Sequence, residues 1–180
     1  MKYHLLLGAL LAHYAGFPVL AQENRTVLPG LQDDGAVMLP TQWSLKPAGR
    51  QLAVGDLPVN MVLHPQGRWL AVLCAGYGDH EIVVVDLKSA RLASRTIVRQ
   101  TFYGLAFNDS GDRIYASGGE FEVVHSWSFA DGLLSEPRQY RVALEAEKFV
   151  PAGIAAAQDG RTLYVACPWG QSVCVVSTDG

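Results

Sequence analysis

Residue types that bind ligands gather in the predicted loops of this 180-residue chain. Asp79, His80 and Glu81 are consecutive, and carboxylate and imidazole groups bind cations or polar ligands where several of them converge. Aromatic loop residues offer flat surfaces on which a ligand can stack. We therefore predict a ligand-binding loop face; the alternative is solvated loop charge together with rings that cover sheet edges. The predicted face consists of Tyr77, Asp79, His80, Glu81, Tyr103, Glu120 and Trp169.

The remaining histidines predict no catalytic centre. His64 begins a His-Pro-Gln-Gly turn and is expected to cap its own backbone. His125 shares strand parity with Trp127, so we expect a hydrogen-bonded packing residue between sheets. A lone histidine without a nucleophile has little to act on. We predict no catalytic residue, no metal site and no cofactor.

These loops must be held by a repeated unit. Three similar segments align on the turn glycines Gly67, Gly111 and Gly160, which are 44 and 49 residues apart. Each unit has an apolar run, a tight polar turn, a second run, a variable loop and a third run. The first two units also have a fourth run. Short runs rich in Val, Ile, Tyr, Phe and Trp, cut by Gly, Pro, Asn and Asp, predict β-strands.

The predicted strands form up-and-down antiparallel sheets of four. In such a sheet the loops between the second and third strands emerge on the same side as the connections to the next sheet, which gathers the predicted site residues on one face. Asn60, Tyr103 and Pro151 are expected nearer the axis, where each innermost strand begins. The expected strands are 61–63, 69–73, 82–85 and 91–98; then 105–107, 113–116, 123–129 and 139–144; then 154–156, 163–166 and 172–176.

Four-stranded units at this period predict an all-β fold, a β-propeller of four-stranded antiparallel blades. Residues 57–99 and 100–145 are two full blades. Residues 41–54 are expected to supply the third and fourth strands of a preceding blade, and the last unit stops after its third strand. We therefore expect residues 41–180 to be part of a propeller in an N-terminal fragment of a longer chain. The alternative is a ring completed by several short chains.

Cysteine placement follows the repeat. Cys74 and Cys167 each stand seven residues after a turn glycine, where the middle unit has Gly118, so a small residue is expected at this position. Cys167 and Cys174 flank one loop, and a bridge between them is conceivable. The odd count leaves one thiol over, and we favour buried free thiols.

The N-terminal residues predict export. A lysine at position 2 is followed by an apolar run and then by Val19-Leu20-Ala21, which is typical of a signal peptide, residues 1–21, cleaved after Ala21. An uncleaved anchor is the alternative. Residues 22–40 are expected to be a linker. The mature chain is then periplasmic or extracellular, without a membrane span.

The formal net charge of the chain is −3, and no cluster of Lys and Arg forms a basic stripe. Binding to nucleic acid requires such an electrostatic footprint. We therefore predict no nucleic-acid partner.

Residues 158–166, Gln-Asp-Gly-Arg-Thr-Leu-Tyr-Val-Ala, resemble the Pro-Asp-Gly-Lys-x-Leu-Tyr-Val-Ala core of YVTN-type β-propeller repeats, and residues 65–72 and 109–116 are looser copies. These repeats belong with the lactonase-like seven-bladed propellers. The resemblance spans residues 41–180. It also implies a likeness to exported bacterial proteins in which an alkaline-phosphatase-like phosphoesterase domain follows an N-terminal propeller.

Three functions follow from the motifs and the resemblance. The first is an exported propeller that binds an unknown protein or small-molecule ligand, or serves as a scaffold, with the remaining blades in the same chain. The second is the accessory propeller of a secreted phosphoesterase whose catalytic domain lies beyond residue 180. The third is a lactonase-like hydrolase, which requires acidic or histidine ligands near the axis; Asn60, Tyr103 and Pro151 are a poor set for that chemistry.

Overall fold

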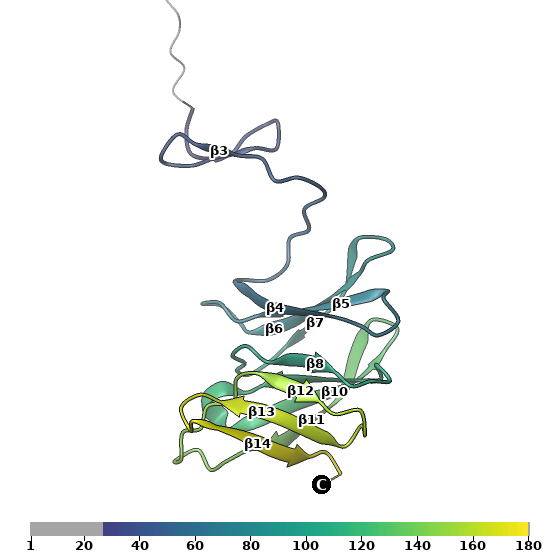
Figure 1. Ribbon diagram of the computed structural model, residues 1–180. Coiled ribbons are helices and arrows are strands. Elements are labelled where there is room, and N and C mark those ends of the chain that lie inside the picture. The colour runs from purple at the N-terminus through teal and green to yellow at the C-terminus, as the bar shows by residue number, and fades with distance from the viewer. Residues whose placement is uncertain (1–26, 180) are drawn as a thin grey trace, which may run out of the picture. The chain divides into compact units, whose positions relative to one another are not determined.

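The computed structural model describes residues 27–179, and they form an all-β structure (Figure 1). The chain divides into two units, one on each side of the boundary between Arg50 and Gln51. Each unit is described by itself. The predicted signal peptide, residues 1–21, lies outside the described residues.

The first unit contains a small three-stranded antiparallel sheet. Its strands are β1 (Gly30–Leu31), β2 (Val37–Met38) and β3 (Ser44–Leu45), paired in chain order. Asp34 shapes the β1–β2 turn, because its carboxylate accepts the Ala36 N–H at 3.0 Å and contacts the Lys46 ammonium at 3.1 Å. These two hydrogen bonds lower the pKa of Asp34.

The first unit corrects the prediction for residues 41–54. We expected the third and fourth strands of a blade, but this segment holds only β3, which pairs with β2. Pro47 and Gly49 explain the difference: proline has no N–H to donate to a ladder, and Gly49 adopts a positive φ of 79°. The segment expected to be a linker, residues 22–40, contains β1 and β2.

The second unit consists of three antiparallel sheets, two of them four-stranded, in the arrangement of an incomplete propeller (Figure 1). Each sheet keeps its strands in chain order. The first holds β4 (Pro58–Leu63), β5 (Trp69–Cys74), β6 (Glu81–Asp86) and β7 (Arg91–Ile97). The second holds β8 (Leu105–Phe107), β9 (Arg113–Ser117), β10 (Val123–Ala130) and β11 (Leu133–Arg141), and the third holds β12 (Ile154–Ala156), β13 (Thr162–Cys167) and β14 (Ser172–Ser177).

Ten of these strands match the predicted runs to within a few residues, and β11 is the exception. We expected the fourth strand of the second sheet at 139–144, but β11 begins at Leu133, directly after the Asp131-Gly132 turn. Both turn residues have positive φ, 47° and 82°, as a two-residue hairpin requires. Pro137 makes this strand hard to predict from the sequence, because proline has no N–H to donate to a strand ladder. The structure accommodates Pro137 because β11 is an edge strand with a register shift at this point.

The three glycine turns share one geometry, as the repeat predicts. Gly67, Gly111 and Gly160 have φ values of 74°, 78° and 69°. Each donates its N–H to the carbonyl three residues earlier, at 2.8 to 3.2 Å. A side chain at this φ is strained, which explains why glycine recurs at this position.

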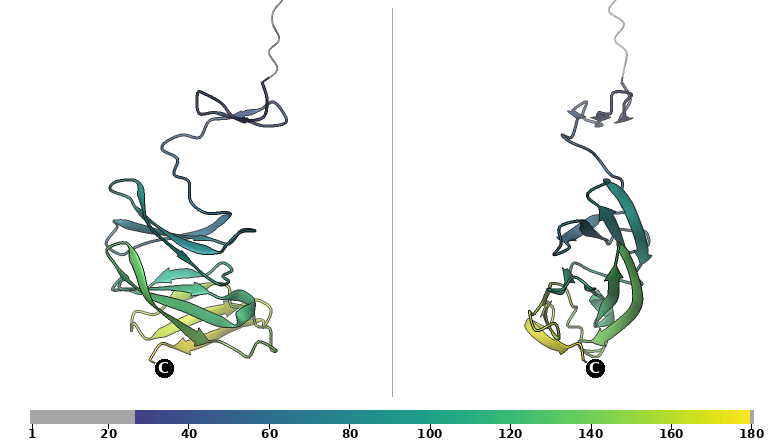
Figure 2. Two further views of the ribbon diagram at one scale, coloured as in Figure 1. Left: turned by 180° about the vertical axis from the view of Figure 1, so that it is seen from behind. Right: turned by 90° about the vertical axis from the view of Figure 1, so that its right-hand side faces the viewer.

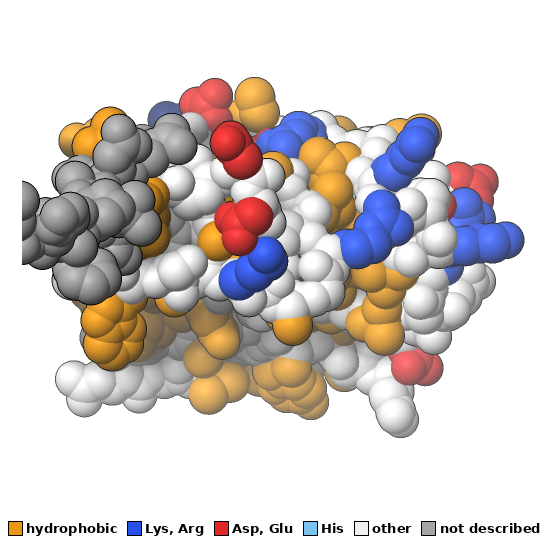
Figure 3. All heavy atoms as spheres, turned by 90° about the horizontal axis from the view of Figure 1, so that it is seen from above, with side chains coloured by type: hydrophobic (Ala, Val, Ile, Leu, Met, Phe, Trp, Pro, Cys, Tyr) orange, Lys and Arg blue, Asp and Glu red, His pale blue; other side chains and the backbone are white. Residues whose placement is uncertain are grey.

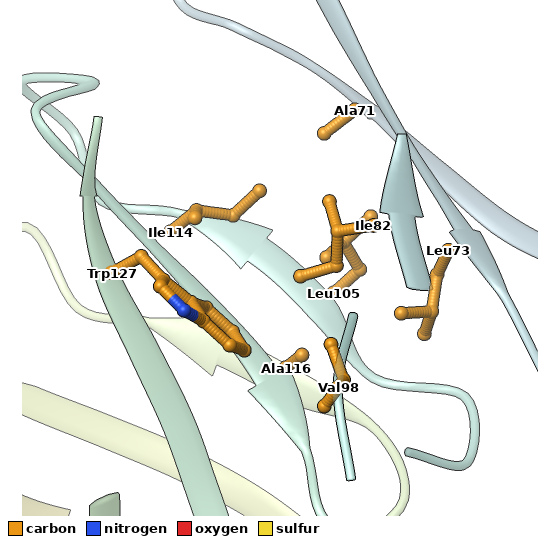
Figure 4. Packing of buried hydrophobic residues seen from close by; sticks show 8 residues of the cluster. All are labelled: Ala71, Leu73, Ile82, Val98, Leu105, Ile114, Ala116 and Trp127. Atoms are coloured by element: carbon orange, nitrogen blue, oxygen red, sulfur yellow. The ribbon is translucent and has the colours of Figure 1, made fainter. Parts of the chain in front are cut away.

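The sheets pack face to face, with β8 lying between β4 and β12 (Figures 1 and 2). Apolar side chains fill the space between the first two sheets (Figure 4). Trp127 contributes the largest ring and is 6% exposed. Burial of such side chains, at about 25 cal/mol per Å², provides the main force that holds one sheet to the next. The cluster consists of Ala71, Leu73, Ile82, Val98, Leu105, Ile114, Ala116 and Trp127.

The third sheet leaves one face uncovered in the described part of the chain. Val173 and Val175 on β14 are 64% and 68% exposed. By strand register Val173 corresponds to Val124 of the second sheet, which is completely buried against the third sheet. The same face of the repeat is therefore a core surface wherever a following sheet covers it.

Candidate functional site

The loops expected to share one face lie close to the sheet connections. Residues 75–80, 118–122 and 168–171 join second to third strands, and residues 98–104 and 142–153 join one sheet to the next. The Thr101 N–H donates to His80 Nδ1 at 2.9 Å, which ties the first loop to the first connection. The Gly170 N–H donates to the Phe149 carbonyl at 3.3 Å, which ties the third loop to the second connection.

The side chains of two of the seven predicted site residues have a hydrogen-bond or ion-pair partner within residues 27–179. His80 accepts the Thr101 hydrogen bond, and Glu81 forms an ion pair with Arg95, with 2.6 Å between Oε1 and Nη1. These side chains hold the end of the first sheet together.

The other five predicted residues are exposed to solvent. They are not joined to one another, or to His80 and Glu81, by any hydrogen bond or ion pair within residues 27–179. The loop face thus presents separate polar and aromatic side chains, and its role in binding stays a prediction. The five are Tyr77, Asp79, Tyr103, Glu120 and Trp169.

A repeated contact, which we call the connector clasp, fastens each sheet to the connection that follows it. In both complete sheets the residue before the third strand supplies a side-chain acceptor: His80 Nδ1 for the Thr101 N–H, and the Glu122 carboxylate for the Val150 N–H at 3.0 and 3.1 Å. The backbone carbonyls of His80 and Glu122 also accept bonds, from the N–H groups of Val98 and Val142.

Of the two side-chain acceptors in the connector clasp, Glu122 is the more deeply buried. Its side chain is fully buried and its φ is 55°, which is costly for a residue with a Cβ. The sequence placed this glutamate in a loop and gave no sign of its burial. The repeat offered one signal: when the third strands of the two sheets are aligned in sequence, Glu122 occupies the same position as His80.

The predicted axial residues come together in part. Asn60 Nδ2 donates to the Tyr103 carbonyl at 2.9 Å, so the innermost strand of the first sheet is tied to the chain that enters the second. Pro151 is buried. These contacts give the axial positions a structural role.

Both histidine interpretations are confirmed. His64 Nδ1 accepts the N–H of Gln66 at 3.1 Å inside its own turn, and its Nε2 lies 2.9 Å from the Gly111 carbonyl. His125 lies between sheets, with Nε2 3.0 Å from the Gln100 carbonyl and Nδ1 3.2 Å from Gln139 Nε2. Burial lowers the pKa of His125.

The prediction of a small residue at the end of the second strand is also confirmed. A Cβ added at Gly118 would lie 2.5 Å from the Val123 side chain. Cys74 and Cys167, at the same position, are buried thiols. Burial raises the pKa of Cys74, and burial with the adjacent Cys174 raises the pKa of Cys167 to about 12.

A groove of about 610 Å³ separates the outer parts of the first two sheets. We call it the inter-sheet groove. Trp127 and Val98 form part of its lining, and Leu134 adds a further apolar surface. Arg99 borders it from the first connection, and Arg138 borders it from β11. The lining also includes Thr96, His125, Ser135 and Gln139, so polar and apolar side chains are mixed along the groove.

The charge around the inter-sheet groove differs from that of the whole chain. Of the described residues that line it, two are arginines and none is Asp or Glu, whereas the chain carries a net charge of −3. The Arg99 guanidinium lies over the Phe121 ring, 4.4 Å from its centroid. On the face shown in Figure 3, basic side chains likewise lie beside exposed hydrophobic ones.

The hairpin of β10 and β11 positions one wall of the inter-sheet groove. Its tip contacts the first sheet, where Ser94 Oγ donates to the Gly132 carbonyl at 2.6 Å. A β-bulge in β11 between the partners of Ser126 and Ser128 changes the direction of the strand before Arg138. The first sheet has a register shift at the equivalent place, between Val84 and Val85, so the bulge belongs to the repeat.

Within residues 27–179, no three His, Cys, Asp or Glu residues come together as a metal site. None of the helical residues described there makes a helix of the length and apolarity that crossing a bilayer requires.

No known protein family and no curated protein matches this sequence. Solved structures resemble its fold. Hydrazine synthase from Kuenenia stuttgartiensis superposes with a TM-score of 0.56 at 15% identity, over 68% of this chain and 40% of that one. A functionally unknown protein from Desulfotomaculum acetoxidans gives 0.59 at 15% identity, over 81% and 44%.

A chain of the mitotic checkpoint complex gives a TM-score of 0.54 at 14% identity, over 66% of this chain and 35% of that one. The present chain spans less than half the length of each of these three structures. At such identities the likeness shows the fold alone, and it agrees with an incomplete propeller-like architecture.

Proposed function

We propose that this chain is a binding module of an exported propeller protein and that its inter-sheet groove holds an organic anion. The single observation that carries the proposal is that two arginines, Arg99 and Arg138, line the same groove as apolar side chains such as Trp127 and Leu134. Arginine binds carboxylate and phosphate groups through paired N–H donors. A ligand with an acidic group and a flat apolar part matches this lining.

Membership in the YVTN-type repeats and export both belong to this proposal. The first rests on residues 158–166 and their two copies, and the second rests on the signal-like residues 1–21. A binding role agrees with what the described residues offer, which is a groove that two arginines line. The phosphoesterase-linked and lactonase-like alternatives require catalytic groups beyond those described.

A matched pair of probes tests the proposal. We choose 2-naphthoate, a flat ring with a carboxylate, and 2-naphthamide, its neutral counterpart, and measure both by isothermal titration calorimetry. We expect naphthoate to bind more tightly. Arg99→Gln and Arg138→Gln should each weaken naphthoate binding about tenfold, which corresponds to one charge-assisted hydrogen bond of about 1.4 kcal/mol. Naphthamide binding should change less than twofold.

Arg141→Gln is the matched control, because Arg141 is an exposed arginine at the end of the same strand that does not line the groove. It should leave naphthoate affinity within twofold of the original. Equal affinities for the two probes would contradict the proposal. So would an equal effect of all three substitutions, since that would reflect net charge alone.

A further inference from the structure

Cys167 and Cys174 form an isolated pair of thiols at one end of the third sheet. Their Sγ atoms are 3.6 Å apart, which is van der Waals contact. Cys167 pairs with Ser172 and Cys174 pairs with Val165, so the two cysteines are diagonal neighbours across the β13–β14 ladder. Side chains in this diagonal relation can touch when they lean toward each other.

The repeat shows that this pair is particular to the third sheet. At the equivalent positions the first sheet has Cys74 and Val83. The second sheet has Gly118 and His125, where a Cβ added to the glycine would come within 3.1 Å of His125 Nε2. The diagonal therefore brings side chains together in every sheet, and only in the third of these sheets are both residues thiols.

The pair is within reach of a reagent. Cys174 is partly exposed, whereas Cys167 is buried. Cys167 also borders a surface depression of about 490 Å³, together with Pro168 and Ser172. A disulfide requires the sulfurs to approach from 3.6 Å to about 2.05 Å, so closure requires a further shift of the two side chains toward each other.

We propose that Cys167 and Cys174 are an oxidation site that closes to an intramolecular disulfide in exchange with an external disulfide. The Cys174 thiolate attacks one sulfur of the external disulfide, forms a mixed disulfide and releases one thiolate. The Cys167 thiolate then attacks Cys174 Sγ, forms the Cys167–Cys174 bond and releases the second thiolate. The two protons lost by the cysteines pass to the released thiolates, so the external disulfide is reduced to two thiols.

The bond fixes the ends of β13 and β14 and the loop between them, which carries Trp169 of the predicted loop face. Covalent closure removes conformational freedom from the unfolded chain and therefore raises stability. The raised pKa of Cys167 makes the second step slow at neutral pH, because the thiolate is the attacking species. The closure rate should then rise about tenfold per pH unit between pH 7 and 9.

The test incubates the native chain with oxidised glutathione, followed by alkylation, intact mass measurement and peptide mapping. We expect the loss of two hydrogen atoms, one remaining thiol at Cys74, a peptide that links 167 to 174, and a melting temperature higher by several degrees. Cys74→Ser is the matched control and should close as the original does. Cys174→Ser should show no closure and no rise in melting temperature.

Other outcomes would overturn the proposal. These are a stable glutathione adduct at Cys174, a bond that includes Cys74, a covalent dimer, or three free thiols after prolonged oxidation. The map of the unaltered chain decides the question even if a variant fails to fold. None of these outcomes depends on whether the inter-sheet groove binds an anion.

Discussion

Replacement of Glu122 should reveal how strongly the connector clasp holds two sheets together. The Glu122 carboxylate is fully buried and is the side-chain acceptor for the Val150 N–H. Glu122→Ala removes this acceptor and most of the side chain. Glu122→Gln keeps the side-chain length and one carbonyl oxygen in place. The difference between the two variants therefore isolates the hydrogen bond and the packing of the side-chain stem from other changes.

The structure sets the expected magnitude. A buried hydrogen bond to a carboxylate contributes about 1.5 to 3 kcal/mol, and the one buried methylene group that alanine lacks contributes about 0.8 kcal/mol. Glu122→Ala should therefore lower the free energy of unfolding by about 3 kcal/mol. Glu122→Gln should lower it by about 1 kcal/mol, because a neutral acceptor replaces a charged one. The positive φ of Glu122 is equally unfavourable in all three forms and cancels.

Urea unfolding followed by tryptophan fluorescence measures these differences, and hydrogen exchange at the Val150 amide locates them. Exchange at Val150 should accelerate by at least tenfold in Glu122→Ala. His80→Ala is the matched control in the first sheet and should cost about 1 kcal/mol, since it removes one neutral acceptor. Equal losses for the alanine and glutamine variants, or an unchanged Val150 exchange rate, would refute the reasoning.

Three further predictions test the packing. Trp127→Ala should lower the free energy of unfolding by about 3 to 5 kcal/mol, because it empties the core between the first two sheets; a loss below 1 kcal/mol in urea unfolding would contradict this. Asn60→Ala should lower the free energy of unfolding by about 1 kcal/mol in the same assay, because it removes the hydrogen bond from the Asn60 side-chain amide to the Tyr103 carbonyl. If that bond is the cause, hydrogen exchange should rise most near Tyr103. Since burial lowers the pKa of His125, the unfolded chain binds more protons just below pH 6.5, and stability should fall as the pH drops through that value, by at most about 1.4 kcal/mol per unit. Melting curves across this range should show the fall, and His125→Gln should reduce it.

The repeat explains why most strands could be predicted from the sequence. Each glycine turn fixes the phase of the two strands beside it, so β8 and β12 were predicted to the residue. Where the repeat signal was interrupted, prediction failed. Pro137 concealed the start of β11, and residues 41–54 have a strand-like composition but no following partner strand to pair with.

The candidate sites also differ in how far they could be predicted from the sequence. The sequence identified loop residues by their chemical types, and the structure places them on connected loops without joining the five exposed ones. The inter-sheet groove was not predicted, because Arg99 and Arg138 are far apart in the sequence and line one groove only when two sheets pack. The burial of Glu122 likewise depends on a contact with Val150, which lies 28 residues later.

The connector clasp also bears on the order in which the chain can mature. His80 finds its partner 21 residues further along, and Glu122 finds its partner 28 residues further along, so each bond runs only forward. During synthesis a sheet can fold early, but its final fastening must wait until the following connection has left the ribosome. Repeat proteins gain stability from neighbour to neighbour. We therefore expect a vectorial process, in which each newly made segment secures the sheet before it.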